Sequence, residues 1–228
     1  MTPTTETTLL VYPDAAFEEN PEGSKEFGRE ANRFLAHFQL DPATCTYRFP
    51  TGVEFQSRAP GVLAAIEARK DLRTLVVLSH GWDKGIQPGF SLRSAPELAQ
   101  TLAAHSTPDL TVVLYCCHTA EGAVPTGLTA PGGDGGFADT LRDDLCLAGC
   151  VNCRVYGHDL KGHTTKNPRV RVFEGTGARQ GGQGGQWLIE PGTPIFKRWN
   201  ELLHAEDSTL HFDFPFLTNE ELLSQLRE

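Results

Sequence analysis

Short apolar runs rich in β-branched residues alternate along the first two thirds of the chain with segments whose apolar residues recur at helical spacing. Runs without polar alternation are typical of strands buried on both faces of a parallel sheet, whereas apolar residues at i, i+4, i+7 and i+8 describe one face of a helix. The pattern predicts strands at residues 8–12, 45–49, 75–81, 110–117 and 152–156, and helices at residues 25–38, 60–69, 94–105 and 137–147. This order predicts an α/β fold: a three-layer sandwich with a mainly parallel central sheet and helices on both faces.

The chain from about residue 157 follows a less regular pattern. Two candidate strands at residues 169–173 and 186–190 flank a glycine-rich stretch, which predicts a hairpin with a long loop. Closing helices are expected at residues 196–204 and 218–226. We find neither an internal repeat nor a convincing linker, so residues 1–228 are predicted to form a single domain.

Composition and charge narrow the class of protein. The chain is 39% hydrophobic and 21% charged, with a formal net charge of −9. No block of lysines and arginines is present, so neither nucleic acid nor an anionic membrane is expected as a partner. No apolar run approaches the ~20 residues of a membrane-spanning helix. Residues 1–8 are polar and lack the pattern of a signal peptide, so a cytoplasmic location is expected.

The six cysteines are expected to be free thiols, because the chain shows no export signal. Cys146, Cys150 and Cys153 have a spacing that a metal would accept, with His158 as a conceivable fourth ligand. Good zinc signatures carry two paired ligand sets, however, and only one is present here. His158 and His163 also lack the spacing of a helical ligand pair. The sequence therefore predicts no metal site.

Two of the expected strands end in reactive side chains. Leu-Val-Val-Leu-Ser-His-Gly brings His80 to the end of one strand, and Leu-Thr-Val-Val-Leu-Tyr-Cys-Cys brings Cys117 to the end of the next. In open α/β sheets, ligands bind beyond the carboxyl ends of the strands. A thiol beside an imidazole is the minimum requirement for cysteine nucleophilic catalysis. We therefore expect Cys117 to be the nucleophile, His80 to transfer protons, and the amides of Gly81 and Cys117 to bind an oxyanion.

Structural interpretations of the same residues stay open. A cysteine at the end of a buried strand is usually an inert core residue, and we expect this for Cys116, which alternates with Cys117 along the strand. Asp83 follows the His-Gly pair and either orients His80, binds a positive substrate group or lies exposed in a loop. His118 either tunes the thiol or is a solvated loop residue.

The two strand ends resemble those of the caspase-like cysteine peptidases, which include caspases, metacaspases, clostripain-like enzymes and the CHAT type. Ser79-His80-Gly81 is similar to the His-Gly of that superfamily, and the segment from Leu114 to Ala120, Leu-Tyr-Cys-Cys-His-Thr-Ala, is similar to its nucleophile motif. Gly136-Phe-Ala-Asp-Thr-Leu141 also resembles the helix start that follows the cysteine loop in bacterial members. The resemblance covers roughly residues 8–156.

Two departures limit what the resemblance implies. His80 and Cys117 are 37 residues apart, whereas caspases separate these residues by about 50. Metacaspases carry an aspartate two residues before the cysteine, which helps to bind basic substrate residues, and the chain has Tyr115 there. A preference for basic residues is therefore not carried over.

The resemblance implies a bacterial cysteine endopeptidase that cleaves through a Cys117–His80 dyad and a thioacyl-enzyme and needs no metal or organic cofactor. The expected partners are a protein or peptide substrate and, as an open alternative, a regulatory protein. Asp83, Tyr115 and His118 are weaker candidates for substrate contact. The alternative function is a binding or scaffold module that keeps the fold without turnover, and Tyr115 is the residue that leaves it open.

Overall fold

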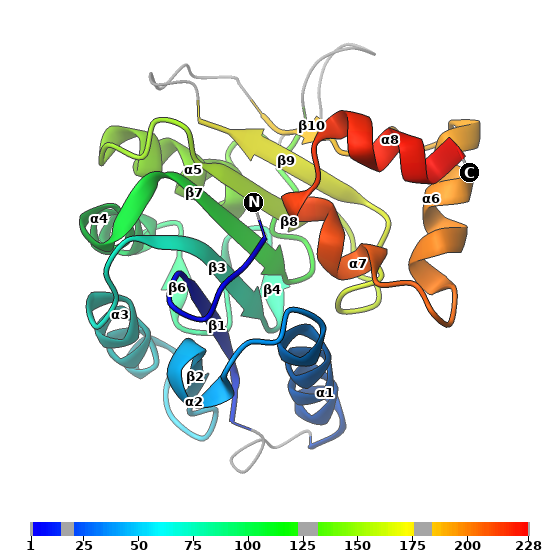
Figure 1. The fold of residues 1–228 in the computed structure, drawn as a ribbon. Helices are drawn as coiled ribbons and strands as arrows, with labels where there is room; N and C mark the ends of the chain where they lie inside the picture. Colours follow the sequence, from blue (N-terminus) through cyan, green and yellow to red (C-terminus); the bar gives the residue numbers. More distant parts are fainter. Residues whose placement is uncertain (1, 15–20, 123–131, 176–183, 228) are drawn as a thin grey trace.

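The computed structural model describes residues 2–14, 21–122, 132–175 and 184–227. The described residues contain a seven-stranded sheet with the order β10-β9-β8-β7-β3-β1-β2 (Figure 1). Its strands are β1 (Thr8–Pro13), β2 (Thr46–Phe49), β3 (Leu72–Leu78), β7 (Ser106–Tyr115), β8 (Arg154–His158), β9 (Val170–Glu174) and β10 (Gln186–Trp187). The first five run parallel, and β9 and β10 run antiparallel. The expectation of a mainly parallel sheet is confirmed, as is the antiparallel pairing of the two late strands.

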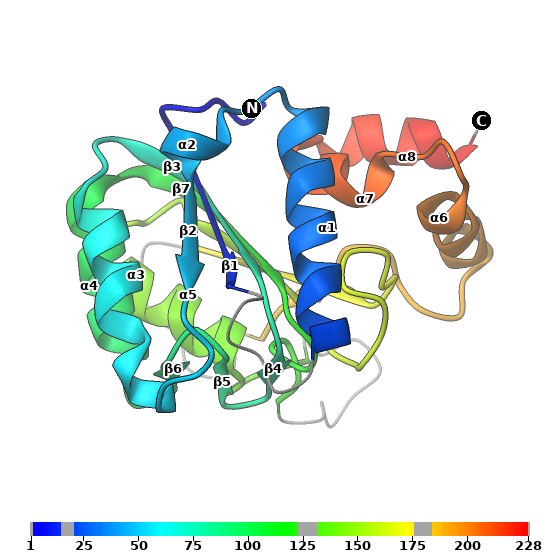
Figure 2. The same ribbon diagram turned by 90° about the horizontal axis from the view of Figure 1, so that it is seen from below.

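Helices cover both faces of this sheet, as the alternation of strands and helices predicted. Figure 2 shows α3 and α4 on one side of the sheet and α1 on the other. The longer helices are α1 (Pro21–His37), α3 (Ala59–Glu67), α4 (Ala95–His105), α5 (Phe137–Leu147), α6 (Pro194–His204) and α8 (Asn219–Arg227). The shorter ones are α2 (Pro42–Cys45), η2 (Phe55–Ser57), α7 (Leu210–Asp213) and η3 (Phe214–Phe216).

Two hydrophobic cores fill the space between the helices and the sheet. One core joins α3, α4 and α5 to the sheet, and the other joins α1, α6, α7 and α8 to the opposite face. Successive residues of the central strands alternate between them: Val112 and Leu114 belong to the first core, and Val113 and Tyr115 to the second. This alternation follows from the pleat of a strand, which points neighbouring side chains to opposite faces.

Several local features differ from the sequence prediction. Residues 81–91 form a small antiparallel sheet of β4 (Gly81–Trp82), β5 (Gly85–Ile86) and β6 (Phe90–Ser91), where only a loop was expected. Strands of two residues leave no periodicity to detect. Much of the glycine-rich stretch lies outside the described residues.

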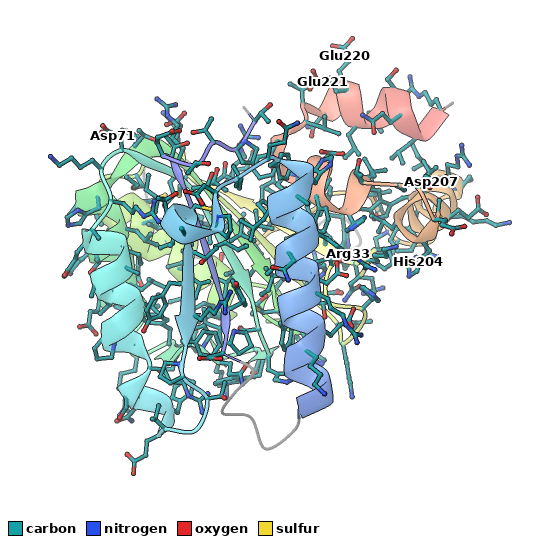
Figure 3. The ribbon with its side chains drawn as sticks, turned by 60° about the horizontal axis from the view of Figure 1, so that its bottom comes forward. Arg33, Asp71, His204, Asp207, Glu220 and Glu221 are labelled. Atoms are coloured by element: carbon teal, nitrogen blue, oxygen red, sulfur yellow. The ribbon has the colours of Figure 1, made fainter. Side chains whose placement is uncertain are left out.

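Some charged side chains of the helices point into solvent. Glu220 and Glu221 project from α8 away from the body of the protein in Figure 3. Within the described part of the chain, we find no helix that combines the length and the apolar character needed to cross a bilayer.

Candidate active site

The register of two neighbouring strands brings His80 and Cys117 to the same level. β3 pairs with β7 in parallel, and the pairing ends with Leu78 opposite Tyr115. One residue further, Ser79 Oγ lies 3.3 Å from Cys116 Sγ, so the same offset continues beyond the strands. His80 and Cys117 are the next residues in this register. The two motifs identified in the sequence therefore meet at the carboxyl edge of the sheet.

Strand alternation also places these two residues on the same face of the sheet. Val76 and Leu78 of β3 point into the core beneath α1, and so do Val113 and Tyr115 of β7. His80 and Cys117 continue these two series. Ser79 and Cys116, by contrast, meet on the other face, and Cys116 belongs to the core beneath α3, α4 and α5. The expectation that Cys116 is a core residue is confirmed.

The imidazole of His80 packs against α1. The ring of Phe27 meets the His80 ring edge to face, with their centroids 5.0 Å apart and an interplanar angle of 87°. Phe27 is itself buried, whereas His80 is exposed. Aromatic packing of this kind restricts how a side chain rotates. Phe27 was not identified from the sequence, because its contact with His80 arises only when α1 packs on the sheet.

Gly81 lies where a side chain has no room. A Cβ at this position would come within 2.7 Å of the Cys116 Cβ and 2.8 Å of the Cys117 carbonyl oxygen. Glycine is therefore required for the His-Gly segment to approach the chain around the candidate nucleophile. The close approach gives a direct structural reason for glycine after His80.

The amide of Gly81 is free of the neighbouring strand ladder. Gln87 N–H donates to the His80 carbonyl at 2.9 Å, while Gly81 stands opposite Ile86. Antiparallel ladders alternate between pairs that share hydrogen bonds and pairs that do not. Gly81 and Ile86 therefore form a pair of the second kind, and the Gly81 N–H points away from β5. An N–H that the strand ladder does not use is one requirement of the expected oxyanion donor.

The chain turns sharply after Cys117. His118 has a φ of +61°, and its Nδ1 lies 2.6 Å from Glu121 Oε2. The Thr119 hydroxyl donates to the Cys116 carbonyl at 3.1 Å. These local contacts hold the turn that presents Cys117, which is half-buried. His118 lies beside the candidate nucleophile and is paired with an acid.

The prediction that Tyr115 contacts substrate is wrong. Its side chain is only 1% exposed, and its hydroxyl donates to the His211 carbonyl at 2.6 Å. The short helix α7 carries His211 and covers this part of the sheet. Burial raises the pKa of Tyr115 well above its usual range. Tyr115 is therefore a core residue beneath the site.

Asp83 joins the His-Gly loop to α5 through its backbone. The Phe137 N–H donates to the Asp83 carbonyl at 2.8 Å, and the next amide, Ala138 N–H, donates to the Thr119 carbonyl. The start of α5 is thereby held against both motifs. In the part of the chain that the structure describes, no hydrogen bond links the Asp83 carboxylate to His80, so a role in orienting that ring has no structural support.

The loop after β8 forms the other side of the site. The Gly162 carbonyl lies 4.0 Å from Cys117 Sγ, as an acceptor for the thiol. Thr165 holds this loop to α1, because its buried hydroxyl donates to Glu30 Oε2 at 2.6 Å. Arg169 holds its far end through two bonds of 2.8 Å to the Asp159 carboxylate. Sequence reasoning did not identify Gly162 or Thr165 as site residues.

The two adjacent thiols differ in environment. Cys116 is 1% exposed, and burial raises the pKa of its thiol to about 12, although Ser79 opposes the shift. A thiol with so high a pKa carries almost no thiolate near neutral pH. Cys117 is the thiol with access to solvent. Among the described residues, no hydrogen bond joins Cys117 Sγ to the His80 ring, and catalytic contacts are often long before substrate binds.

Three potential metal ligands, Glu26, Glu30 and His163, lie within 4.8 Å of one another beside the loop. Protein groups already contact all three, and for Glu26 the partner is Arg29, whose Nη1 donates to Glu26 Oε2 at 3.2 Å. Glu30 binds Arg33 and Thr165, and Nδ1 of His163 accepts from the backbone N–H groups of Thr165 and Lys166. A neutral imidazole that accepts at Nδ1 carries its proton on Nε2 and has no second free lone pair for a metal. These contacts favour a loop anchor over a metal centre.

The cysteine cluster is remote from the site. Cys146, Cys150 and Cys153 are free, buried thiols in the core at the end of α5 and the start of β8. His158 stands at the opposite end of β8, so strand length separates it from Cys153 by roughly 16 Å. The conceivable four-ligand set is therefore not assembled.

Two clefts lined by residues that the structure describes lie away from Cys117. One, of about 120 Å³, is lined by Arg73, Asp109 and Arg154 near the amino ends of the parallel strands. Another, of about 280 Å³, lies between β9, β10 and α8 and is lined by neither cysteine nor histidine. We place the candidate site at the carboxyl edge because the candidate nucleophile Cys117 and the candidate acid–base group His80 meet there.

Comparison of the chain with protein-family models, with curated proteins and with solved structures found no match.

Proposed function

We propose that this protein is a cysteine endopeptidase of the caspase-like type, with Cys117 as nucleophile and His80 as general acid and base. The observation that carries the proposal is the β3–β7 register, which continues through the 3.3 Å contact of Ser79 with Cys116 and brings His80 level with Cys117 on one sheet face. The strand order, with β3 and β7 adjacent at the centre of a mainly parallel sheet, agrees with the resemblance of the two motifs.

The proposed reaction begins when His80 takes the proton of the Cys117 thiol and Cys117 Sγ attacks the carbonyl carbon of the scissile peptide bond. The carbonyl oxygen takes up the electron pair and accepts hydrogen bonds from the Gly81 and Cys117 amides. Preorganised donors of this kind usually supply the largest single share of catalysis. The C–N bond then breaks, and His80 protonates the departing amine, which leaves a thioester on Cys117.

Hydrolysis completes the cycle without a cofactor. His80 removes a proton from water, and the resulting hydroxide attacks the thioester carbonyl. The C–S bond breaks, the thiolate leaves, and the second product departs as a carboxylic acid. Phe27 supports both half-reactions by packing against the His80 ring.

A binding module without turnover is the second candidate function. Its support is the contact of Cys117 Sγ with the Gly162 carbonyl at 4.0 Å, because a carbonyl oxygen stabilises a thiol and not a thiolate. Substrate binding would have to move the thiol or the loop for the proposed chemistry to proceed.

A cleavage profile on a broad peptide library distinguishes the two functions. We expect wild-type protein to cleave a subset of peptides, and we expect Cys117→Ala and His80→Ala each to reduce kcat/KM by at least about a hundredfold. Cys116→Ala is the matched control and should retain activity, because Cys116 faces the other core. Circular dichroism should show folded protein for all variants. Activity that survives Cys117→Ala would refute the assignment.

A further inference from the structure

The large apolar side chains that remain exposed are distributed unevenly. Among the described residues, these are Val53, Trp82, Leu147, Val151 and Leu160. Leu147 and Val151 lie between the end of α5 and the start of β8, at the amino edge of the sheet. Trp82, which is 38% exposed, and Leu160, which is 43% exposed, follow β3 and β8 at the carboxyl edge.

The strand order places Cys117 between Trp82 and Leu160. β3, β7 and β8 are consecutive in the sheet, and Cys117 follows the middle one. Neighbouring strands are about 4.8 Å apart, so β3 and β8 are separated by roughly 10 Å. An extended peptide advances about 3.3 Å per residue, so about three residues reach from one flank to the other. A peptide whose carbonyl lies at Cys117 therefore brings side chains to both flanks.

Residues near Trp82 and near Leu160 in the sequence contact Cys117. Gly81, the residue before Trp82, lies against the Cys117 carbonyl. Gly162, two residues after Leu160, directs its carbonyl at Cys117 Sγ. Trp82 and Leu160 are thus each within two residues of a group that touches Cys117.

Packing contacts hold the indole ring of Trp82 in place. Its ring lies over Gly85 of the paired strand, where a Cβ would come within 2.8 Å of Trp82 Cζ2. The ring of Phe55 packs beside it, with the centroids 5.4 Å apart. An aromatic ring that is already held by packing and keeps over a third of its surface exposed can bind an apolar group at little cost in conformational entropy.

Acidic and basic side chains both lie near Cys117, so the local charge does not favour a substrate of either sign. Asp83 is followed by Lys84 in the loop after Trp82, and His118 is paired with Glu121. A site that selects charged side chains concentrates charge of the opposite sign. Apolar contact is therefore the stronger basis for selectivity here.

We propose that Trp82 and Leu160 form apolar subsites on the two sides of Cys117, so that the enzyme selects peptides with large apolar side chains flanking the scissile bond. This inference rests on the proposed peptidase function and specifies its substrate class.

The test uses quenched fluorescent peptides that differ only in the residues flanking the cleaved bond: leucine or phenylalanine, aspartate, arginine, or glycine. We expect kcat/KM to be at least about tenfold higher for the apolar set than for the glycine set. Trp82→Ala should lower the ratio of kcat/KM for apolar over glycine peptides by about tenfold on one side of the bond, and Leu160→Ala should lower it on the other. Leu147→Ala, at the opposite edge, is the matched control and should change nothing.

Each outcome has a distinct meaning. Equal cleavage of all four sets, unchanged by either variant, would overturn the inference while leaving the peptidase function intact. A uniform loss in Trp82→Ala, glycine peptides included, would also overturn it, because the residue would then act only through the fold. If no peptide is cleaved and an acyloxymethyl-ketone probe fails to label Cys117, the proposed function itself fails.

Discussion

Ser79 Oγ and Cys116 Sγ lie 3.3 Å apart in the core beneath α3, α4 and α5, one residue beyond the last paired residues of β3 and β7. This contact shows that the parallel register persists past the hydrogen-bonded ladder. It also determines which face of the sheet each following side chain occupies, because successive residues of a strand face opposite sides. His80 and Cys117 consequently share the other face, where the ring of Phe27 meets His80.

The two neighbouring thiols should react at very different rates. With limiting iodoacetamide near neutral pH, we expect Cys117 to be alkylated first, because it is accessible, whereas Cys116 is buried and burial raises its thiol pKa to about 12. Peptide mapping by mass spectrometry reads the order directly. Labelling of Cys116 ahead of Cys117 would mean that the strand register is shifted by one residue.

Replacement of Gly81 should damage the site through backbone contact. In Gly81→Ala the new methyl group meets the Cys116 Cβ at 2.7 Å and the Cys117 carbonyl at 2.8 Å, so the two motifs must separate. We expect kcat/KM to fall by about a hundredfold or more, because a misplacement of about 1 Å has that effect. Peptide cleavage measured beside a thermal melt checks the result.

Gly28→Ala is the control for that substitution. Gly28 lies in α1, and a Cβ there meets nothing within 4 Å. Alanine in a helix is more stable than glycine by roughly 0.5–1 kcal/mol, so this variant should melt slightly higher and keep its activity. A similar loss of activity in both variants would contradict the role assigned to Gly81.

The buried bond between Thr165 and Glu30 should hold the loop beside Cys117. Thr165→Val keeps the shape of the side chain but leaves the buried Glu30 carboxylate without one donor. We expect a loss of about 1–3 kcal/mol in the free energy of unfolding and faster hydrogen exchange across residues 159–168. Thr164→Val, at the half-buried neighbour, is the control. Unchanged exchange in Thr165→Val would show that the loop is held by other contacts.

The features that the sequence predicted well are those that local pattern determines. The strand and helix order emerged from apolar runs and helical spacing, and α5 begins and ends where the pattern places it. The alternation of Cys116 and Cys117 required only the pleat of a strand.

The features that the sequence did not predict depend on packing between distant segments. Tyr115 is buried because α7, nearly a hundred residues later, covers it, and a helix of four residues leaves no periodic signal. Phe27 reaches His80 only after α1 docks on the sheet. Gly162 approaches Cys117 because Thr165 and Glu30 bond across the molecule. Contacts of this kind follow from tertiary structure and not from residue spacing.

Two buried histidines should make the fold sensitive to mild acid. Burial lowers the pKa of His158 to about 4 and that of His211 to about 4. An unfolded histidine protonates near pH 6.5, so between about pH 6.5 and 4 the unfolded chain binds more protons than the folded one. Stability is therefore complete above about pH 6.5 and declines as the pH falls toward 4. Asp139, whose pKa burial raises to about 6, acts in the opposite sense over this window.

A comparison of variants isolates the contribution of one histidine from these opposing effects. In wild-type protein each such histidine should lower the free energy of unfolding by up to about 1.4 kcal/mol per pH unit within the window. His158→Gln should remove one histidine's share of that slope, whatever its effect on stability at pH 7.5. His204→Gln, at the exposed residue labelled on α6 in Figure 3, is the control and should keep the wild-type slope. Urea titrations between pH 7.5 and 4.5 measure the free energy of unfolding of each variant as a function of pH. Equal slopes of this free energy against pH for wild type and His158→Gln would show that His158 does not stay neutral in the folded protein.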